Sequence, residues 1–283
     1  MNKTCLITGA TDGIGKQTAL VLAQKGFSLV LVGRSAEKGN LVVSELISAT
    51  GNESIHFHCA DLSNMKSIQQ LSVEIKQNYS AIDILINNAG AYVSKLTMTD
   101  EGFEKTFALN HLAYFHFTEL LLEMVKEDIP GRIINVASMA HKNAKIDFNN
   151  LQMENEYKGW TAYSRSKLMN IMFTYECHRR YSDTGVSFNC LHPGFVKSKF
   201  GDNNKGFAKT SISLAKTIFA INLVKGAKTS IYLASSKDVD GVSGKYFDKC
   251  KVATSSKVSY IQEDQKKLWE ATDQIIKKTY VLG

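Results

Sequence analysis

The sequence predicts an α/β domain in which a parallel sheet is covered by helices on both faces. Short apolar segments alternate regularly with longer segments whose apolar residues recur at helical spacing. The short segments are apolar throughout, which is typical of parallel strands buried on both faces. Only two prolines interrupt the 283 residues, and no repeat or linker is seen, so 1–283 is expected to form one doubly wound domain of about seven strands.

Each expected strand is followed by a glycine-rich or polar turn. Strands are expected over 5–8, 27–32, 55–59, 82–86, 131–136, 186–191 and 245–247. Helices are expected over 16–25, 36–50, 65–79, 100–125, 162–179, 226–234 and 261–278. Lysine, glycine and asparagine crowd 196–210, which indicates a mobile substrate loop over about 195–225 and a lid over the active site. The substrate surface is expected from 92–96, 139–160 and 195–223.

A glycine-rich turn, Thr8-Gly-Ala-Thr-Asp-Gly-Ile-Gly15, joins the first expected strand to the first helix. Glycines permit a tight turn and a close approach of the backbone to a ligand, and a helix N-terminus favours a pyrophosphate. At this junction the turn predicts a Rossmann-type dinucleotide-binding domain. The residues expected to contact the dinucleotide here are Gly9, Thr11, Asp12, Gly13, Ile14 and Gly15.

The end of the second strand predicts which dinucleotide is bound. An acidic residue there would bind the ribose 2′-hydroxyl of NAD, whereas an arginine accommodates the 2′-phosphate of NADP. The chain has Gly33-Arg34-Ser35, with no carboxylate before Glu37. Because the guanidinium of Arg34 is a bidentate phosphate partner and Ser35 adds a hydroxyl, NADP(H) is the preferred cofactor and NAD(H) the alternative.

Polar residues end the fourth and fifth strands. Asn87-Asn-Ala-Gly90 and Ser138 stand at the carboxyl ends of these strands, where open α/β sheets bind their ligands. Asn110 lies within an expected helix although helix interiors disfavour asparagine. We interpret it either as a buried, hydrogen-bonded asparagine or as part of the site.

Tyr163 and Lys167 are four residues apart in the helix expected over 162–179, so they share one face. A free phenol has a pKa of about 10, and a nearby cation lowers it. A pKa near 7 would require roughly 4 kcal/mol of differential stabilisation. We expect this from Lys167 in a closed site, together with the positive ring of an oxidised nicotinamide.

Charge and cysteine content exclude other classes. The net charge of +7 is scattered and no nucleic-acid motif accompanies it, so no nucleic-acid partner is expected. The five cysteines are far apart and lack zinc-ligand spacing, which favours free thiols, no metal and a reducing compartment. With no signal region and no apolar run of about 18 residues, we expect a cytoplasmic protein without a transmembrane segment.

These motifs occur in the order typical of short-chain dehydrogenases/reductases, which the chain resembles over nearly its whole length. The motifs are Gly9/Gly13/Gly15, Asn87-Asn-Ala-Gly90, Asn110, Ser138, Tyr163-x-x-x-Lys167 and Pro193-Gly194. Within this family the chain is similar to the retinol dehydrogenases. That similarity rests on Val32-Gly-Arg-Ser35, Asp61-Leu-Ser63, Arg132–Ser138 followed by Ala140-His141, Tyr163–Leu168, Leu191–Gly194 and Val242–Phe247.

The resemblance implies roles for these residues. Tyr163 would be the acid in carbonyl reduction and the base in alcohol oxidation, and Lys167 would lower its pKa and bind the nicotinamide ribose. Ser138 would bind the substrate oxygen, and Asn110 would hold a water in a relay toward Lys167. Further implied contacts are Asp61 and Leu62 with adenine, Asn88, Ala89 and Gly90 with adenosine and ribose, and Pro193, Gly194, Val196 and Ser198 with the nicotinamide amide.

The sequence departs from the family pattern at three points. Asp12 stands where many NADP-preferring relatives have a basic residue, so the NADP(H) preference rests on Arg34. Ser198 replaces the usual threonine but keeps a hydroxyl. The membrane anchor common among animal retinol dehydrogenases is missing, so we expect a soluble form whose substrate the resemblance leaves open.

The sequence thus predicts an NADP(H)-dependent oxidoreductase that acts on an apolar aldehyde, ketone or primary or secondary alcohol, as a retinol dehydrogenase-like carbonyl reductase. The alternative, a dinucleotide-sensing regulator without turnover, predicts a broken catalytic set, whereas Asn110, Ser138, Tyr163 and Lys167 are all present. A homodimer or homotetramer is expected because helices at 100–125 and 162–179 pack against a second subunit in the family. The apolar residues of the first helix also spread more widely than one buried stripe requires; they are Leu109, Phe115, Phe117, Leu120 and Leu121.

Overall fold

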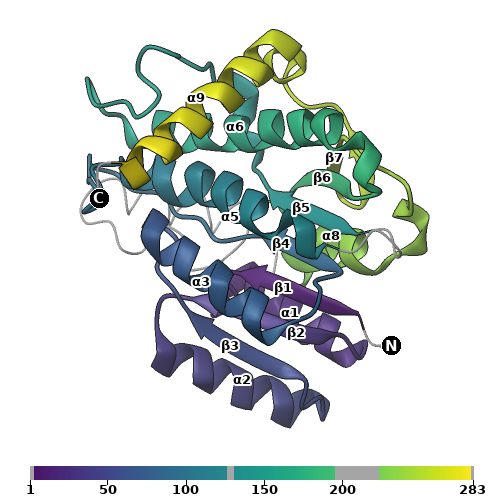
Figure 1. The fold of residues 1–283 in the computed structure, drawn as a ribbon. Coiled ribbons are helices and arrows are strands. Elements are labelled where there is room, and N and C mark those ends of the chain that lie inside the picture. The colour runs from purple at the N-terminus through teal and green to yellow at the C-terminus, as the bar shows by residue number, and fades with distance from the viewer. Residues whose placement is uncertain (1–2, 126–130, 195–222, 282–283) are drawn as a thin grey trace.

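The computed structural model describes residues 3–125, 131–194 and 223–281. Its strands are β1 (Thr4–Thr8), β2 (Ser28–Gly33), β3 (Ile55–Cys59), β4 (Ile84–Asn87), β5 (Arg132–Val136), β6 (Ser187–His192), β7 (Lys245–Asp248) and β8 (Lys251–Ala253). They form one sheet in the order β3-β2-β1-β4-β5-β6-β7-β8 (Figure 1). All neighbouring pairs are parallel except β7 and β8. The chain reverses direction across the sheet between β1 and β4, which places a ligand crevice at the carboxyl ends of these strands.

Helices cover both faces of the sheet, as Figure 1 shows. One face carries α1 (Gly13–Gln24), α2 (Ala36–Thr50) and α8 (Leu223–Ser235). The other face carries α3 (Met65–Asn78), α4 (Lys105–Phe107), α5 (Ala113–Leu121), α6 (Gly159–Arg180) and α9 (Gln262–Val281). The predicted doubly wound α/β class is therefore confirmed.

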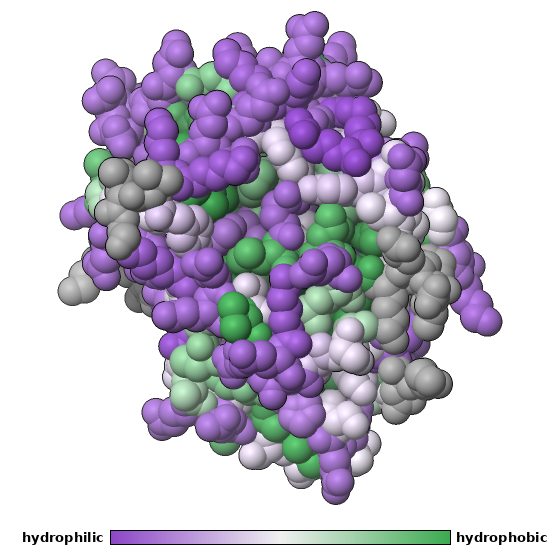
Figure 2. All heavy atoms as spheres, viewed as in Figure 1, coloured by the Kyte–Doolittle hydropathy of each residue, from purple (hydrophilic) through white to green (hydrophobic). Residues whose placement is uncertain are grey.

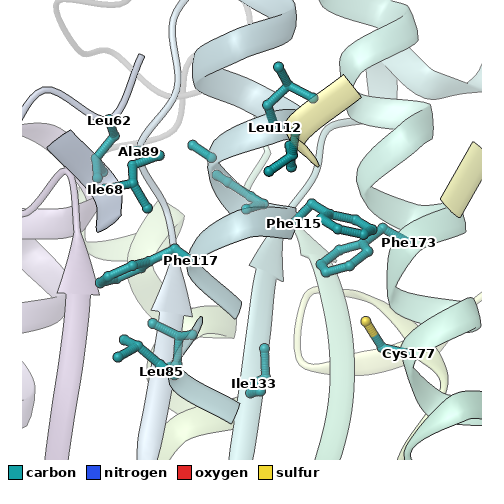
Figure 3. Close-up of a cluster of buried hydrophobic side chains, with 14 of the residues drawn as sticks. Leu62, Ile68, Leu85, Ala89, Leu112, Phe115, Phe117, Ile133, Phe173 and Cys177 are labelled. Carbon is teal, nitrogen blue, oxygen red and sulfur yellow. The ribbon is translucent and has the colours of Figure 1, made fainter. Parts of the chain in front are cut away.

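The larger apolar core lies between the sheet and the second group of helices. In Figure 3, Leu85 and Ile133 project from β4 and β5 toward Phe117 on α5, while Phe115 meets Phe173 of α6. The rings of Phe115 and Phe173 are 5.3 Å apart between centroids. This packing fixes α5 and α6 against the strands that end at the crevice.

All seven expected strands form with ends shifted by at most two residues, and the sequence missed only β8. That strand has three partly or fully exposed residues, Lys-Val-Ala, so it lacks the apolar run by which the other strands were found. The expected mobile loop over 195–225, with its lid over 196–210, lies outside the described residues except for 223–225, which begin α8.

The expected continuous helix over 100–125 is wrong in its start and its regularity. Gly102 has a φ of +78°, so helical structure begins only after Glu104, whose carboxylate accepts from the backbone N–H groups of Thr106 and Phe107. A π-helical segment, η1 (Ala108–Leu112), then separates α4 from α5. Such a wide turn displaces the helix from the regular pattern by which it was predicted.

Helix α9 lies across α5 and α6, as its position in Figure 1 shows. The Trp269 ring is 4.6 Å from that of Phe115 and 5.7 Å from that of Phe173, between centroids. On the opposite side the helix is hydrophilic (Figure 2). Phe115 was one reason to expect a second subunit here, and its apolar contacts are instead made by α9 of the same chain. The homo-oligomer prediction itself stays a prediction.

Among the described residues, no helix combines the length and the apolar character needed to cross a bilayer.

Candidate active site at the carboxyl ends of β1, β4 and β5

The glycine-rich turn after β1 leaves no room for a side chain at Gly9 or at Gly15. Gly9 has a φ of +65°, and a Cβ added there would lie 2.8 Å from Ala89 Cα. A Cβ on Gly15 would lie 2.3 Å from the carbonyl oxygen of Gly9. Asp12 caps α1 by accepting from the Gly13 N–H at 2.8 Å. Because backbone fills this space, the glycine spacing is required to bring the N-terminus of α1 to the crevice.

The turn is tied to the end of β4 by hydrogen bonds. Asn88 Nδ2 donates to the carbonyl oxygens of Thr8 and Gly9 at 2.8 Å and 3.2 Å. Thr8 Oγ1 accepts from the backbone N–H groups of Asn88 and Ala89 at 2.9 Å and 3.0 Å. Asn88 was predicted to contact adenosine and ribose, but its side-chain amide is committed to β1. Its observed effect is to hold the two strand ends together at the predicted dinucleotide site.

The end of β2 presents a free cation. Arg34 is exposed and forms no hydrogen bond or ion pair within the described part of the chain. Ser35 caps α2 by accepting from the Lys38 N–H at 3.3 Å. Lys38 Nζ in turn lies 3.1 Å from Asp12 Oδ2. The carboxylate of Asp12, which counted against a 2′-phosphate, is thus partly neutralised by Lys38.

The predicted adenine contacts follow β3. Asp61 is exposed, and its Oδ1 accepts from the Ser63 N–H at 2.8 Å and the Ser63 hydroxyl at 2.7 Å. Leu62 is buried in the core cluster. Asp61 Oδ1 therefore fixes the turn after β3, and both of its contacts with Ser63 leave the second carboxylate oxygen, Oδ2, out of the turn.

Tyr163 and Lys167 lie on one face of α6 and are both buried. Lys167 Nζ donates to the carbonyl oxygen of Val136 at 2.9 Å and lies 5.8 Å from the centroid of the Tyr163 ring. Ser138, directly after β5, hydrogen-bonds through its side chain to the Tyr163 phenol. The structure therefore brings together the phenol, hydroxyl and ammonium that the sequence placed in one site.

Burial moves the two pKa values in opposite directions. It raises the pKa of Tyr163 to about 12, against which the Ser138 hydrogen bond acts, and it lowers the pKa of Lys167 to about 7. In the protein alone, burial sets the direction of the Tyr163 shift, and the predicted lowering of its pKa by Lys167 is not seen. Tyr163 is a neutral phenol at neutral pH, and Lys167 exchanges its proton there.

Asn110 lies in the π-helical segment η1 and is fully buried. Its Oδ1 accepts from the Ala91 N–H, and its Nδ2 donates to the Ala91 carbonyl, both at 2.9 Å. Nδ2 also donates to Ser166 Oγ at 3.0 Å. A Cβ on Gly90 would lie 3.2 Å from Asn110 Oδ1 and 3.3 Å from Lys167 Nζ. The absence of a side chain at Gly90 therefore allows Asn110 and Lys167 to approach the backbone of this residue closely.

Two histidines to which the sequence assigned no catalytic or binding role, His141 and His192, hold the backbone of the site in place. His192 Nδ1 accepts from the backbone N–H groups of Met139 and Gly194 at 3.1 Å and 3.2 Å. His141 contacts the Ser138 carbonyl through Nδ1 at 2.6 Å, and its Nε2 accepts from the Ser256 N–H at 3.0 Å. Their positions in the sequence could have indicated this role, since His141 comes three residues after Ser138 and His192 directly precedes Pro193. Val196 and Ser198, the remaining predicted nicotinamide contacts, lie outside the described residues.

Comparison with known proteins identifies the class. The family model described as short chain dehydrogenase matches residues 3–207. The chain belongs to the short-chain dehydrogenase/reductase family and is an NAD(P)-dependent oxidoreductase acting on CH–OH groups. Its relatives place it in the retinol dehydrogenase subgroup. Human retinol dehydrogenase 11 is 38% identical over 274 residues, covering 97% of this chain and 86% of its own. Human retinol dehydrogenase 13 is 36% identical over 279 residues, covering 97% and 84%.

Solved structures agree with the fold. An uncharacterised protein of Mycobacterium paratuberculosis superimposes with a TM-score of 0.77 at 27% identity, covering 97% of this chain and 93% of its own. A short-chain dehydrogenase of Shigella flexneri, solved in complex with NADP, superimposes with a TM-score of 0.68 at 23% identity, covering 89% and 98%.

The residues present fit a nicotinamide dinucleotide. The backbone cradle at Gly9 and Gly15 admits no side chain, as a pyrophosphate site at a helix N-terminus requires. Gly90 likewise places no side chain beside Lys167 Nζ. Arg34, Asp61 and Gly194 stand at the ends of three further strands along the same edge of the sheet.

Proposed function

We propose that the chain is an NADP(H)-dependent oxidoreductase that interconverts an apolar aldehyde or ketone and the corresponding primary or secondary alcohol, as a retinol dehydrogenase-like carbonyl reductase. The observation that carries this proposal is the contact between the Ser138 and Tyr163 hydroxyls, with Lys167 buried beside them. Two hydroxyls meeting at one point can hold a carbonyl oxygen between them.

In the direction of reduction, the chemistry that a bound dinucleotide would supply is a hydride for the carbonyl carbon. Ser138 holds the oxygen as negative charge develops on it. Tyr163 gives its phenolic proton to that oxygen, for which its neutral state is suited. Lys167 then stabilises the phenolate until a proton returns, and its pKa of about 7 lets it pass one on at neutral pH. Asn110 holds η1 to Ala91 and so shapes the space beside Lys167.

NADP(H) is the proposed cofactor because Arg34 is exposed and unpaired in the described structure. Its guanidinium can bind a 2′-phosphate in bidentate fashion. The ion pair of Asp12 with Lys38 reduces the repulsion that Asp12 would exert on that phosphate. NAD(H) remains the alternative. The Shigella flexneri protein that was solved with NADP has a similar fold.

Two further properties, the location and the oligomeric state, belong to the proposal. A cytoplasmic location agrees with the free cysteines at 5, 59, 177, 190 and 250, which suit a reducing compartment. A homodimer or homotetramer would have to use a surface other than the part of α5 and α6 that α9 covers.

The test is NADPH consumption against aldehydes and ketones of graded chain length, in the wild type and in Tyr163→Phe. The variant keeps the ring and loses the proton donor, so it should lose turnover while its affinity for NADPH, measured by titration, changes little. Wild-type turnover by Tyr163→Phe would refute the assignment. A wild type that binds NADPH but turns over nothing would favour the alternative of a dinucleotide-sensing regulator.

A further inference from the structure

A cavity of about 430 Å³ lies between the segment after β5 and the first turns of α6. Ser138 lines it, so the cavity adjoins the hydroxyl that contacts Tyr163. Met139, Ala140 and Ala144 provide apolar wall, and Trp160 adds an aromatic ring. Its size and apolar wall are those of a small-molecule site.

Two cations also line this cavity. Lys145 and Arg165 are part of its wall, and no carboxylate is found among the lining residues that the structure describes. Neither side chain forms an ion pair within the described ranges. Two cations without an ion-pair partner, at the wall of an apolar cavity, attract an anion.

Two polar groups at the wall lack partners. Ser164 is 6% exposed, and its Oγ has no hydrogen-bond partner. Arg165 Nε is likewise buried without a partner, although Nη1 of the same side chain donates to the Asn150 carbonyl at 3.3 Å. Because neither atom is accessible to water, neither faces the open cavity, and the groups of the wall that can meet an anion are the two cations.

We propose that this cavity is a subsite for substrates whose carbonyl-bearing chain ends in a carboxylate, as in ω-oxocarboxylic acids. The apolar wall takes the chain, and Lys145 and Arg165 take the carboxylate, whose two oxygens match a guanidinium. The proposal rests on the proposed function, since Ser138 connects the reacting carbonyl to the cavity.

The first experiment compares kcat/KM for ω-oxocarboxylates of graded length with kcat/KM for n-alkanals of matched length. At the length that spans the cavity, the acid should be preferred by roughly ten- to a hundred-fold, as for one charge-assisted hydrogen bond. The double variant Lys145→Gln/Arg165→Gln should bring this ratio toward one. Lys142→Gln/Lys158→Gln removes two exposed charges that do not line the cavity, and it should keep the wild-type ratio.

Equal or better use of the alkanals by the wild type would overturn the subsite while leaving the proposed function intact. Loss of the acid preference in the control variant to the same extent would also overturn it, because general surface charge would then explain the effect.

A second experiment needs no turnover. Trp160 lines the cavity and is one of only two tryptophans, so its fluorescence should report binding of a saturated monocarboxylate of the preferred length. The Trp160→Phe variant shows how much of the fluorescence change comes from Trp160 and how much from the other tryptophan. Saturable binding that Lys145→Gln/Arg165→Gln weakens at least about tenfold supports the subsite, even if neither substrate series is turned over and the proposed function fails. Binding that the double variant leaves unchanged would overturn the proposal.

Discussion

His141 Nδ1 lies 2.6 Å from the carbonyl oxygen of Ser138, and this contact fixes the state of the imidazole. A carbonyl can only accept, so Nδ1 carries the proton and donates it. Nε2 accepts from the Ser256 N–H at 3.0 Å, so that nitrogen is unprotonated. Only the neutral ring can make both bonds at once, because protonation of Nε2 would remove the acceptor for the Ser256 N–H. Burial favours this neutral ring by lowering the pKa of His141. His141 therefore positions Ser138 through the backbone carbonyl of that residue.

We expect His141→Ala to lower kcat by about tenfold while leaving the affinity for NADPH little changed, because Ser138 loses its support. His141→Asn should recover part of the loss, since its amide can still donate to the Ser138 carbonyl. Steady-state kinetics on both variants measures this, and His56→Asn on the exposed part of β3 is the control. A wild-type kcat in His141→Ala would show that Ser138 needs no such support.

The same contact predicts a pH dependence of stability. The pKa of folded His141 lies below its ordinary value of about 6.5, so the neutral ring contributes its full stability above that pH. The contribution is lost as pH falls from 6.5 toward the folded pKa. The groups that face His141 and His192 are Lys142, Tyr246, Asp248 and Lys249. His141→Asn should reduce the slope of unfolding free energy against pH below 6.5, by at most about 1.4 kcal/mol per pH unit. Denaturant titrations at several pH values test this, and an unchanged slope would contradict it.

The sequence revealed the features that depend on local spacing. Gly9 and Gly15 are glycines because backbone occupies the place of their Cβ atoms, and that requirement appears directly as a motif. The pKa values of Tyr163 and Lys167 could not be predicted, because they depend on burial by the whole fold. The role of His141 was missed for a similar reason, since Ser256 is 115 residues away in the chain.

Cofactor choice should depend on Arg34. Arg34→Ala removes a charge-assisted phosphate contact, so we expect roughly ten- to a hundred-fold weaker binding of NADPH and little change for NADH. Lys38→Ala should shift the preference in the same direction by a smaller factor, because Asp12 loses its counter-ion at a partly exposed site. The ratio of kcat/KM for the two cofactors is the measurement, with Lys25→Ala as an exposed control.

An NADH preference in the wild type, or an unchanged ratio in Arg34→Ala, would refute this role. Gly33→Asp is a poor test of the same question. A Cβ at Gly33 would lie 2.8 Å from Thr11 Cγ2, so the substitution disturbs the dinucleotide turn as well as adding a charge.

Trp269 of α9 packs between α5 and α6. Besides Phe115 and Phe173, its ring meets the Arg180 guanidinium at 4.5 Å from the centroid. Trp269→Ala should lower the free energy of unfolding by about 3–5 kcal/mol, as for a large aromatic residue removed from a core. Val252→Ala, at a residue 59% exposed, should change it by less than about 0.5 kcal/mol. Because the variant uncovers apolar surface on α5 and α6, it should also associate more than the wild type in sedimentation at micromolar concentration. Equal stability of Trp269→Ala and the wild type would show that α9 docks without holding these helices.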